Sequence, residues 1–236
     1  MPVEEIRSAT RFADHVRQFV ATIQYRRIET EDDLDLVRRL RYEAYLKEGA
    51  ISETAEKRMV DRYDDLDNVV NIGLFLDDKL VSALRMHFLS NVNDISPSLD
   101  VFPDFLLPLL QAGKKMADPN KFVADHEAAR KFPQLAYATT RLTMMAGSYF
   151  NAQLAIISPR AEHQAFYQRT FFAKTICPPR AYPALSKPIC LMLGDYEADT
   201  DKIIQRHPFY ASTAAERERL FGKIKIDPKH QSAAAA

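Results

Sequence analysis

Apolar side chains at helical spacing mark the first elements of the chain. They recur every three or four positions over residues 4–23 and predict an amphipathic helix. A short strand over residues 25–29 follows. Thr30 and the three carboxylates after it form a start signal for a second helix, which Gly49 ends.

Alternating apolar and polar positions next predict a β-hairpin. Residues 71–76 and 80–88 alternate, and residues 77–79 provide the turn between them. Residues 91–99 are rich in loop formers, and a proline begins a short helix over residues 103–110.

The second half of the chain predicts strands and helices in turn. In chain order they are strand 121–125, helix 135–152, strand 154–158, helix 160–171, and strands 175–179 and 188–193. A threonine and a glutamate in capping-box spacing begin a last helix over residues 213–221. This order predicts an α/β fold with a central mixed, mostly antiparallel twisted sheet and helices on both faces.

Composition favours a single domain over residues 1–236, with an N-terminal helix (1–23), a helical extension (197–222) and a tail (230–236) left out of the interpretation. The 236 residues are 47% apolar and 27% charged, enough for one core without a long linker. The 32 basic and 32 acidic residues provide no global field to attract nucleic acid. Residues 1–23 carry charges throughout, which argues against membrane insertion and leaves peripheral contact open.

Two cysteines, Cys177 and Cys190, show no metal-ligand spacing. We therefore read both as structural and expect a cytoplasmic protein without a permanently bound cofactor. Charge is uneven along the chain: residues 29–68 hold thirteen acidic and seven basic residues, net −6, and residues 159–190 hold five basic residues and one acidic, net +4. An acidic partner would favour the second segment, although both segments are also compatible with solvated faces.

Charged residues recur at four stations near the ends of predicted elements. These are Arg41 with Tyr45, the Asp61 to Asp64 pair, Arg85 in the second hairpin strand, and the segment Asp118-Pro119-Asn120-Lys121. Together with the loop Asp100 to Pro103, their order resembles that of the acyl homoserine lactone autoinducer synthases and the related N-acyl amino acid synthases, of the N-acyltyrosine synthase type.

Later motifs are similar to the N-acyl amino acid synthase branch. They are Lys121 to Asp125, Tyr137 to Arg141, Glu162 to Arg169 and His207 to Thr213. The resemblance covers roughly residues 25–222 and implies a GNAT-like acyltransferase fold, in which a splayed strand pair forms the acyl-donor cleft. It implies transfer of a fatty acyl group from acyl carrier protein to the amine of an amino acid.

Three departures from the lactone-synthase pattern are visible. The chain has no tryptophan before the acidic pair, Asp118 replaces the usual glutamate, and Lys121 replaces the usual arginine. A lactone synthase using S-adenosylmethionine, a coenzyme-A-dependent acetyltransferase and a non-catalytic acyl-carrier-binding module remain alternatives.

The connection over residues 126–134 contains no glycine. Enzymes that use free coenzyme A normally hold its pyrophosphate with a glycine-rich turn, so the donor is expected on the phosphopantetheine of acyl carrier protein. Arg130 and Lys131 would then meet its phosphodiester, or are solvated loop cations. Lys121, Phe122 and Val123 complete the expected donor site, where backbone N–H groups could bind the thioester oxygen.

Acyl transfer requires a neutral amine and a proton for the departing thiolate. Asp118, at the entry to strand 121–125, could take the ammonium proton directly or through water, or could be a plain loop or helix-end carboxylate. Tyr167 falls where GNAT enzymes often place a phenol near the sulfur, or is a core tyrosine.

The acceptor site is expected to use five residues: Arg41, Tyr45, Asp61, Asp64 and Arg85. Guanidinium groups suit a substrate carboxylate and carboxylates suit an ammonium, although a structural ion-pair cluster would look the same in sequence. Candidate residues for an acyl channel are Met144, Met145, Phe150, Phe102 and Phe105.

Overall fold

The computed structural model describes residues 3–182 and 185–222, with side chains from residue 11 onward. In this part of the chain the strands are β1 Gln24–Arg27, β2 Val69–Leu76, β3 Lys79–Leu89, β4 Met116–Ala124, β5 Leu154–Ile157, β6 Lys174–Arg180 and β7 Ile189–Asp195. The helices are α1 Val3–Thr22, α2 Glu31–Lys47, α3 Pro97–Val101, α4 Pro103–Gln111, α5 His126–Lys131, α6 Leu135–Phe150, α7 Gln164–Phe171, α8 Tyr196–Arg206 and α9 Ala214–Phe221, with 3₁₀ turns η1 Ala161–His163 and η2 Pro208–Tyr210. None of the described helices is long and apolar enough to cross a membrane.

The described strands form one sheet in the order β1-β2-β3-β4-β5-β7-β6. All neighbours are antiparallel except β4 and β5. These two described strands pair only at Met116 with Leu154 and at Ala117 with Ala155, and diverge beyond that point. The mixed, mostly antiparallel sheet with a splayed central pair is confirmed, and the gap between β4 and β5 defines the site.

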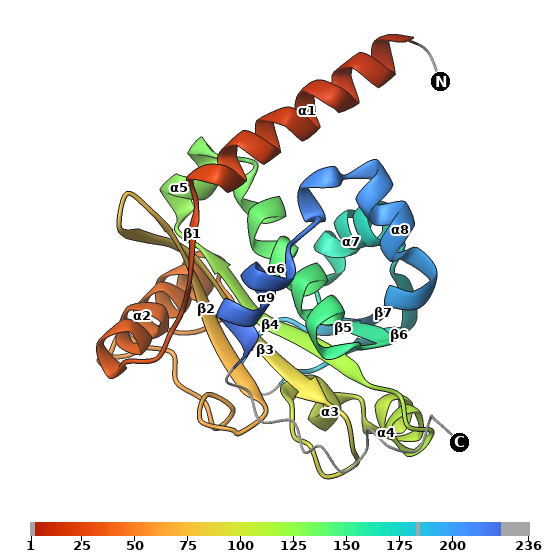
Figure 1. Cartoon of the computed structure of the whole chain (residues 1–236). Helices are drawn as coiled ribbons and strands as arrows, with labels where there is room; N and C mark the ends of the chain where they lie inside the picture. The colour runs from red at the N-terminus through yellow and green to blue at the C-terminus, as the bar shows by residue number, and fades with distance from the viewer. Residues whose placement is uncertain (1–2, 183–184, 223–236) are drawn as a thin grey trace.

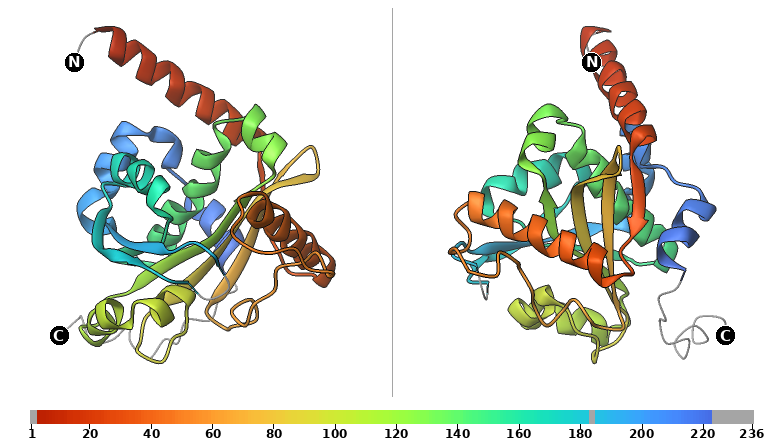
Figure 2. Two further views of the ribbon diagram at one scale, coloured as in Figure 1. Left: turned by 180° about the vertical axis from the view of Figure 1, so that it is seen from behind. Right: turned by 90° about the vertical axis from the view of Figure 1, so that its left-hand side faces the viewer.

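Helices cover both faces of the sheet (Figures 1 and 2). On one face α6 packs on β3 and β4, where Leu84, Met86 and Leu142 belong to the largest apolar cluster. On the other face Val37 and Leu40 of α2 pack on β3 and β4. Side chains alternate along a strand, so the sheet separates these two layers.

The expected elements are confirmed where a local signal specifies them. Thr30 caps α2 by accepting from Asp33 N, and the Thr213 and Glu216 capping box begins α9. Asp77 and Asp78 both have positive φ, as a two-residue hairpin turn requires.

Two expectations about loops are wrong. The predicted loop 91–99 contains the start of α3, which Ser96 caps by accepting from Leu99 N. The connection 126–134 contains α5, capped by Asp125. Helices this short bury too few periodic residues to appear in the hydrophobic pattern.

Strand β4 begins at Met116, five residues before its predicted start at Lys121. Asp118 is therefore a strand residue paired with His87 and not a loop residue at the strand entry. Pro119 made the segment look like a turn, because proline removes a ladder donor. It is tolerated here because β5 has already diverged from β4 at this position.

Candidate active site

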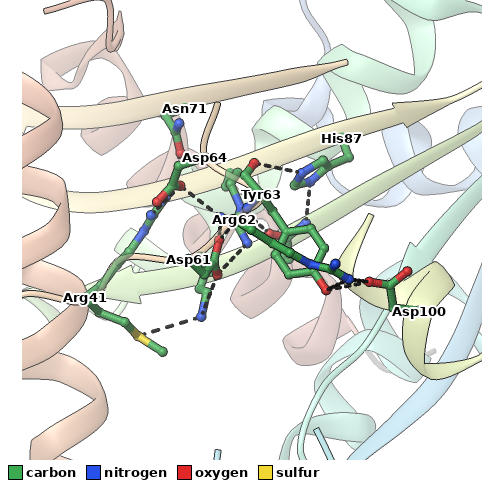
Figure 3. Close-up of polar contacts among 12 residues, drawn as sticks. Arg41, Asp61, Arg62, Tyr63, Asp64, Asn71, His87 and Asp100 are labelled. Carbon is green, nitrogen blue, oxygen red and sulfur yellow. Dashed lines mark hydrogen bonds and ion pairs between the residues drawn. The ribbon is translucent and has the colours of Figure 1, made fainter. Parts of the chain in front are cut away.

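Arg41, Arg85 and Asp64 form a buried ion cluster between α2 and the sheet. Figure 3 shows Arg41 and Asp64 within it. Asp64 Oδ1 accepts from Arg41 Nη1 at 2.7 Å and from Arg85 Nη1 at 2.9 Å. Arg41 Nη2 also donates to Asn71 Oδ1 at 2.6 Å. The side chain of Asp64 is 0% exposed and that of Arg85 0%, so this carboxylate holds two guanidinium groups away from solvent.

Asp61 forms the outer edge of the cluster, with 21% of its side chain exposed. It pairs with Arg85 and lies 3.4 Å from Lys121 Nζ. Burial alone would raise the pKa of Asp61, but the hydrogen bond and charge of Arg85, together with Lys121, lower it to about 2. Asp61 is therefore ionised at neutral pH and directs negative charge toward Lys121.

Lys121 occupies a β-bulge in β4. Two residues of β4, Lys121 and Phe122, face the single residue Leu84 of β3, and Lys121 has φ +51°. A non-glycine residue in this region costs about 1–3 kcal/mol, which the surroundings must offset. Burial lowers the pKa of Lys121 to about 8, while Asp61 opposes the shift.

His87 and Asn120 orient the other side of Arg85. His87 Nε2 lies 3.2 Å from the Tyr63 carbonyl oxygen, to which it can only donate. Burial, with the charge of Arg85, lowers the pKa of His87 to about 3, so its Nδ1 is free to accept from Asn120 Nδ2 at 2.9 Å. Asn120 Oδ1 in turn accepts from Arg85 Nε at 2.7 Å. A neutral histidine thus fixes the direction of the amide.

Asp100 ties the acidic loop to α3. Its Oδ2 accepts from Tyr63 Oη at 2.6 Å and also from Arg62 Nη2 (Figure 3). This contact holds the loop that carries Asp61 and Asp64 against the end of the sheet.

Asp118 lies wholly buried on the α3 side of β4. Burial raises the pKa of its carboxyl group, and hydrogen bonds from Ser96 and Ser98 oppose that shift. Ser98 donates to Asp118 through Oγ at 2.8 Å and through its backbone N–H at 3.3 Å.

A tunnel of about 810 Å³ passes through the gap between β4 and β5. Its lining includes charged or titratable residues of α2, α5 and η1, among them Lys47, Glu127 and His163. On the α6 face its wall is mostly apolar and ends at Met144, Ile203 and other buried side chains. A pocket of this size and lining suits a long apolar ligand that enters by a polar mouth.

Three tyrosines line the tunnel near the bulge. Lys121 Nζ lies 5.2 Å from the ring centre of Tyr45 and 5.8 Å from that of Tyr182. Burial raises the pKa of Tyr45 to about 12, and burial with the nearby Tyr45 raises that of Tyr167 to about 12. Tyr167 packs against Phe166 and Phe171, and its hydroxyl bonds no other described residue.

The tunnel brings together only part of the residues expected from the sequence. It is lined by Tyr45, Lys121, Phe122, Val123, Tyr167 and Met144, whereas Arg41, Asp61, Asp64, Arg85 and Asp118 lie behind its wall. Arg130 and Lys131 are exposed in the last turn of α5 and do not line it. Met145, Phe150, Phe102 and Phe105 are outside the lining as well, packed in the two largest apolar clusters.

Sequence reasoning missed several polar residues of the site. Asn71 was detectable as an amide in an otherwise apolar strand, and Asn120 lies within a motif that had been singled out. Ser98 and Tyr182 lie in segments without a periodic pattern, and Ser158 is only the last residue of the predicted strand 154–158, so no signal in the sequence indicated them as site residues.

The splayed sheet has the fold of the GNAT-like acyltransferases. A sequence model of the N-acyl amino acid synthase FeeM family matches residues 36–195, more than half of the chain. The protein therefore belongs to the FeeM family of N-acyl amino acid synthases. No curated protein matches its sequence significantly.

Solved structures agree on the fold. FeeM, an N-acyl amino acid synthase from uncultured soil microbes, superposes with a TM-score of 0.65 at 16% identity, covering 78% of this chain and 96% of FeeM. The coenzyme-A-dependent acyl-homoserine lactone synthase BjaI matches with a TM-score of 0.53 at 14% identity over 75% of this chain and 83% of BjaI. The lactone synthase LasI matches with 0.51 at 14% identity over 87% and 96%. The expected relationship and fold class are confirmed.

Proposed function

We propose that this acyltransferase moves a fatty acyl group from the phosphopantetheine thioester of acyl carrier protein to the amine of an amino acid. Attack of the amine on the thioester carbon forms the amide C–N bond and breaks the C–S bond, releasing the carrier thiol. The apolar inner part of the tunnel would hold the acyl chain, and the gap between β4 and β5 the thioester.

The start of α5 is the observation that favours a carrier-bound donor. Asp125 Oδ1 accepts from Ala128 N at 2.9 Å and lies 3.5 Å from Lys79 Nζ. The Asp125 carboxylate therefore already accepts from a backbone amide at the start of α5, and its negative charge would repel a pyrophosphate there. The phosphopantetheine of a carrier protein has no pyrophosphate to place there.

Lys121 supports an amino acid as the acceptor. The guanidinium groups of Arg41 and Arg85 are paired within the cluster, whereas Lys121 contacts the tunnel directly. We assign the acceptor's carboxylate to Lys121, beside Tyr45, with Asp61 holding the lysine in position and Arg85 holding Asp61. Peptide N–H groups of β4 beyond Ala117, which have no β5 partner, would bind the thioester oxygen.

Basic residues near α7 suit an acidic carrier protein. Arg160 pairs with Glu48, and Arg180 with Asp104 at 2.6 Å. Arg169 and Lys174 are exposed and form no ion pair within the described residues. The reducing cytoplasm would suit both the carrier and the two free cysteines.

Transfer assays with purified protein test the proposal. A long acyl chain on acyl carrier protein should be transferred to an amino acid in a mixed panel, identified by mass spectrometry, and the rate should fall as salt rises. The matched donor is the same acyl chain on coenzyme A. Turnover with coenzyme A and none with the carrier protein would overturn the donor assignment, and lactone formation from S-adenosylmethionine would overturn the acceptor assignment.

A further inference from the structure

Two serine hydroxyls connect the buried carboxylate of Asp118 with the tunnel. Ser98 Oγ lies 2.8 Å from Asp118 Oδ1 and 2.9 Å from Ser158 Oγ. Both serines line the tunnel, whereas Asp118 does not and is 0% exposed. A substrate amine in the tunnel can therefore exchange a proton with Asp118 only through intervening groups.

The chemistry of the three groups fixes the direction of donation. An ionised carboxylate can only accept, so Ser98 donates its hydroxyl hydrogen to Asp118. Ser98 Oγ is then an acceptor toward Ser158, which donates to it. This order leaves the lone pairs of Ser158 Oγ available to a donor in the tunnel, such as the N–H of an ammonium group.

Ser158 stands where such a donor is needed. It follows β5 directly, on the side where β5 and β4 no longer pair. An amine whose carboxylate is held at Lys121, on the opposite strand, can point toward Ser158 across the same gap that receives the thioester.

We propose that Ser158, Ser98 and Asp118 form a proton relay that takes one proton from the acceptor's ammonium group before it attacks the thioester, an inference that rests on the proposed function. In the relay the ammonium N–H bond breaks as Ser158 accepts, Ser158 passes its own hydrogen to Ser98, and Ser98 passes its hydrogen to Asp118. The neutral amine then forms the C–N bond. Its second proton leaves with the carrier thiol, and Asp118 later returns its proton to solvent by the same path.

The surroundings allow Asp118 to hold that proton. Burial favours its neutral form, while the Ser96 and Ser98 hydrogen bonds and the charge of Arg85 keep the ionised form accessible. The other groups that face it are His87, its partner across β3, and Tyr182 from the connection between β6 and β7. His87 is neutral above about pH 3 and so adds no charge in the working range.

The pH dependence of Ser158→Ala tests the relay. At pH 7 the variant should transfer roughly 10- to 1000-fold more slowly, with little change in the acceptor's KM, on the usual scale for a positioned base. The deficit should shrink as the pH approaches the pKa of the acceptor amine, because a neutral amine needs no base. Ser148→Ala, which removes an exposed hydroxyl from α6 outside the tunnel, is the matched control and should behave as wild type.

A double variant separates a relay from independent effects. Ser158→Ala combined with Asp118→Asn should be no slower than the slower single variant, because both changes break one path. Wild-type rates in Ser158→Ala, a deficit that does not change with pH, or multiplicative deficits in the double variant would each overturn the relay.

Infrared titration gives a readout that needs no turnover. The carboxyl stretch of Asp118, identified by its loss in Asp118→Asn, should titrate at higher pH in Ser158→Ala, because the outer hydroxyl strengthens the bond from Ser98 to the ionised form. An unchanged midpoint would overturn the relay even if acyl transfer is observed. If the wild type acylates no amine from either donor, the proposed function fails and the titration alone decides the relay.

Discussion

At the scale of single residues, the charged side chains that stand out in the sequence are largely paired with one another. Asp64 is shared by Arg41 and Arg85, and Arg85 also bonds Asp61 and Asn120. A buried ion pair adds little net stability compared with an apolar pair, but losing one partner leaves an uncompensated charge. The cluster therefore fixes the position of Asp61 and Lys121 and is sensitive to any single truncation.

Asp64→Ala should destabilise the protein by about 3–5 kcal/mol, because Arg41 keeps only Asn71 and stays buried. Urea unfolding measures the loss. Asp65→Ala, next to it and exposed, should change stability by no more than about 0.5 kcal/mol.

Asp61→Ala should keep cooperative unfolding and lose at least tenfold in specificity for the amino acid. Equal stability loss in Asp61→Ala and Asp64→Ala would contradict the division between them.

His87 makes stability depend on pH. Its pKa is about 3 in the folded protein and 6.5 in a free side chain, so between these values the unfolded chain binds a proton that the fold does not. Stability should therefore fall as the pH drops below 6.5, by roughly 2 to 4 kcal/mol from this group by pH 4. Unfolding curves of His87→Gln should show that much less dependence on pH, whereas His15→Gln, exposed on α1, should keep the wild-type slope.

At the scale of elements, the C-terminal helix is fastened by one residue that serves two contacts. Glu216 accepts from Thr213 N at 2.7 Å in the capping box and from Arg141 Nη2 at 2.9 Å. Arg141 is buried on α6 and also donates to the carbonyl oxygens of Phe209 and Ala211. The guanidinium group of Arg141 thus ties both η2 and α9 to the core helix, alongside the Thr140–Tyr210 and Tyr149–Glu218 hydrogen bonds.

Thr213→Ala should cost about 1 kcal/mol, the usual value of a helix cap. Glu216→Ala should cost more, roughly 2 to 4 kcal/mol, since it also strands the partly shielded charge of Arg141. For a chain of this size each kcal/mol lowers Tm by about 2–4 °C, so calorimetry resolves the two variants. Arg219→Ala, exposed on the same helix, serves as the control; a larger loss in Thr213→Ala than in Glu216→Ala would refute the double role.

At the scale of the whole molecule, the tunnel joins the two helical layers through the sheet. Polar lining residues come from α2 and η1, and buried apolar lining residues come from α6, α8 and β5. Under the proposed function, the acyl chain and the acceptor would approach the thioester from different parts of the molecule, and the length of the inner part would limit the chain that fits.

Ile203→Phe should shorten the accepted acyl chain, because Ile203 lines the inner wall and is 3% exposed. Transfer of the longest chain that the wild type accepts should fall at least tenfold while short chains retain most of their rate. Overpacking should lower the free energy of unfolding by about 1–3 kcal/mol. Ile204→Phe, on the same helix and outside the lining, is the matched control. Competition between acyl donors of different length measures the shift, and equal losses for all lengths would count against this placement of the chain.

The sequence by itself determined the features that depend on neighbours along the chain. Local hydrogen bonds specify the helix starts at Thr30 and Thr213. Positive φ angles at Asp77 and Asp78 specify the hairpin turn, and the alternation of apolar and polar positions specifies its two strands. The order of charged stations was likewise sufficient to indicate the N-acyl amino acid synthase relationship. The caps and the turn can be recognised without knowledge of the fold because the groups that form them lie within a few residues of one another.

Only the tertiary structure decided which charges face a substrate. Arg41, Asp64 and Arg85 come from three separate segments, and their mutual neutralisation depends on burial that no single segment specifies. The early start of β4 depends on β5 diverging beside Pro119, and the approach of Ser98 to Ser158 joins positions 60 residues apart. Contacts between distant segments are set by the packing of the sheet and its helices, so local sequence patterns do not reveal them.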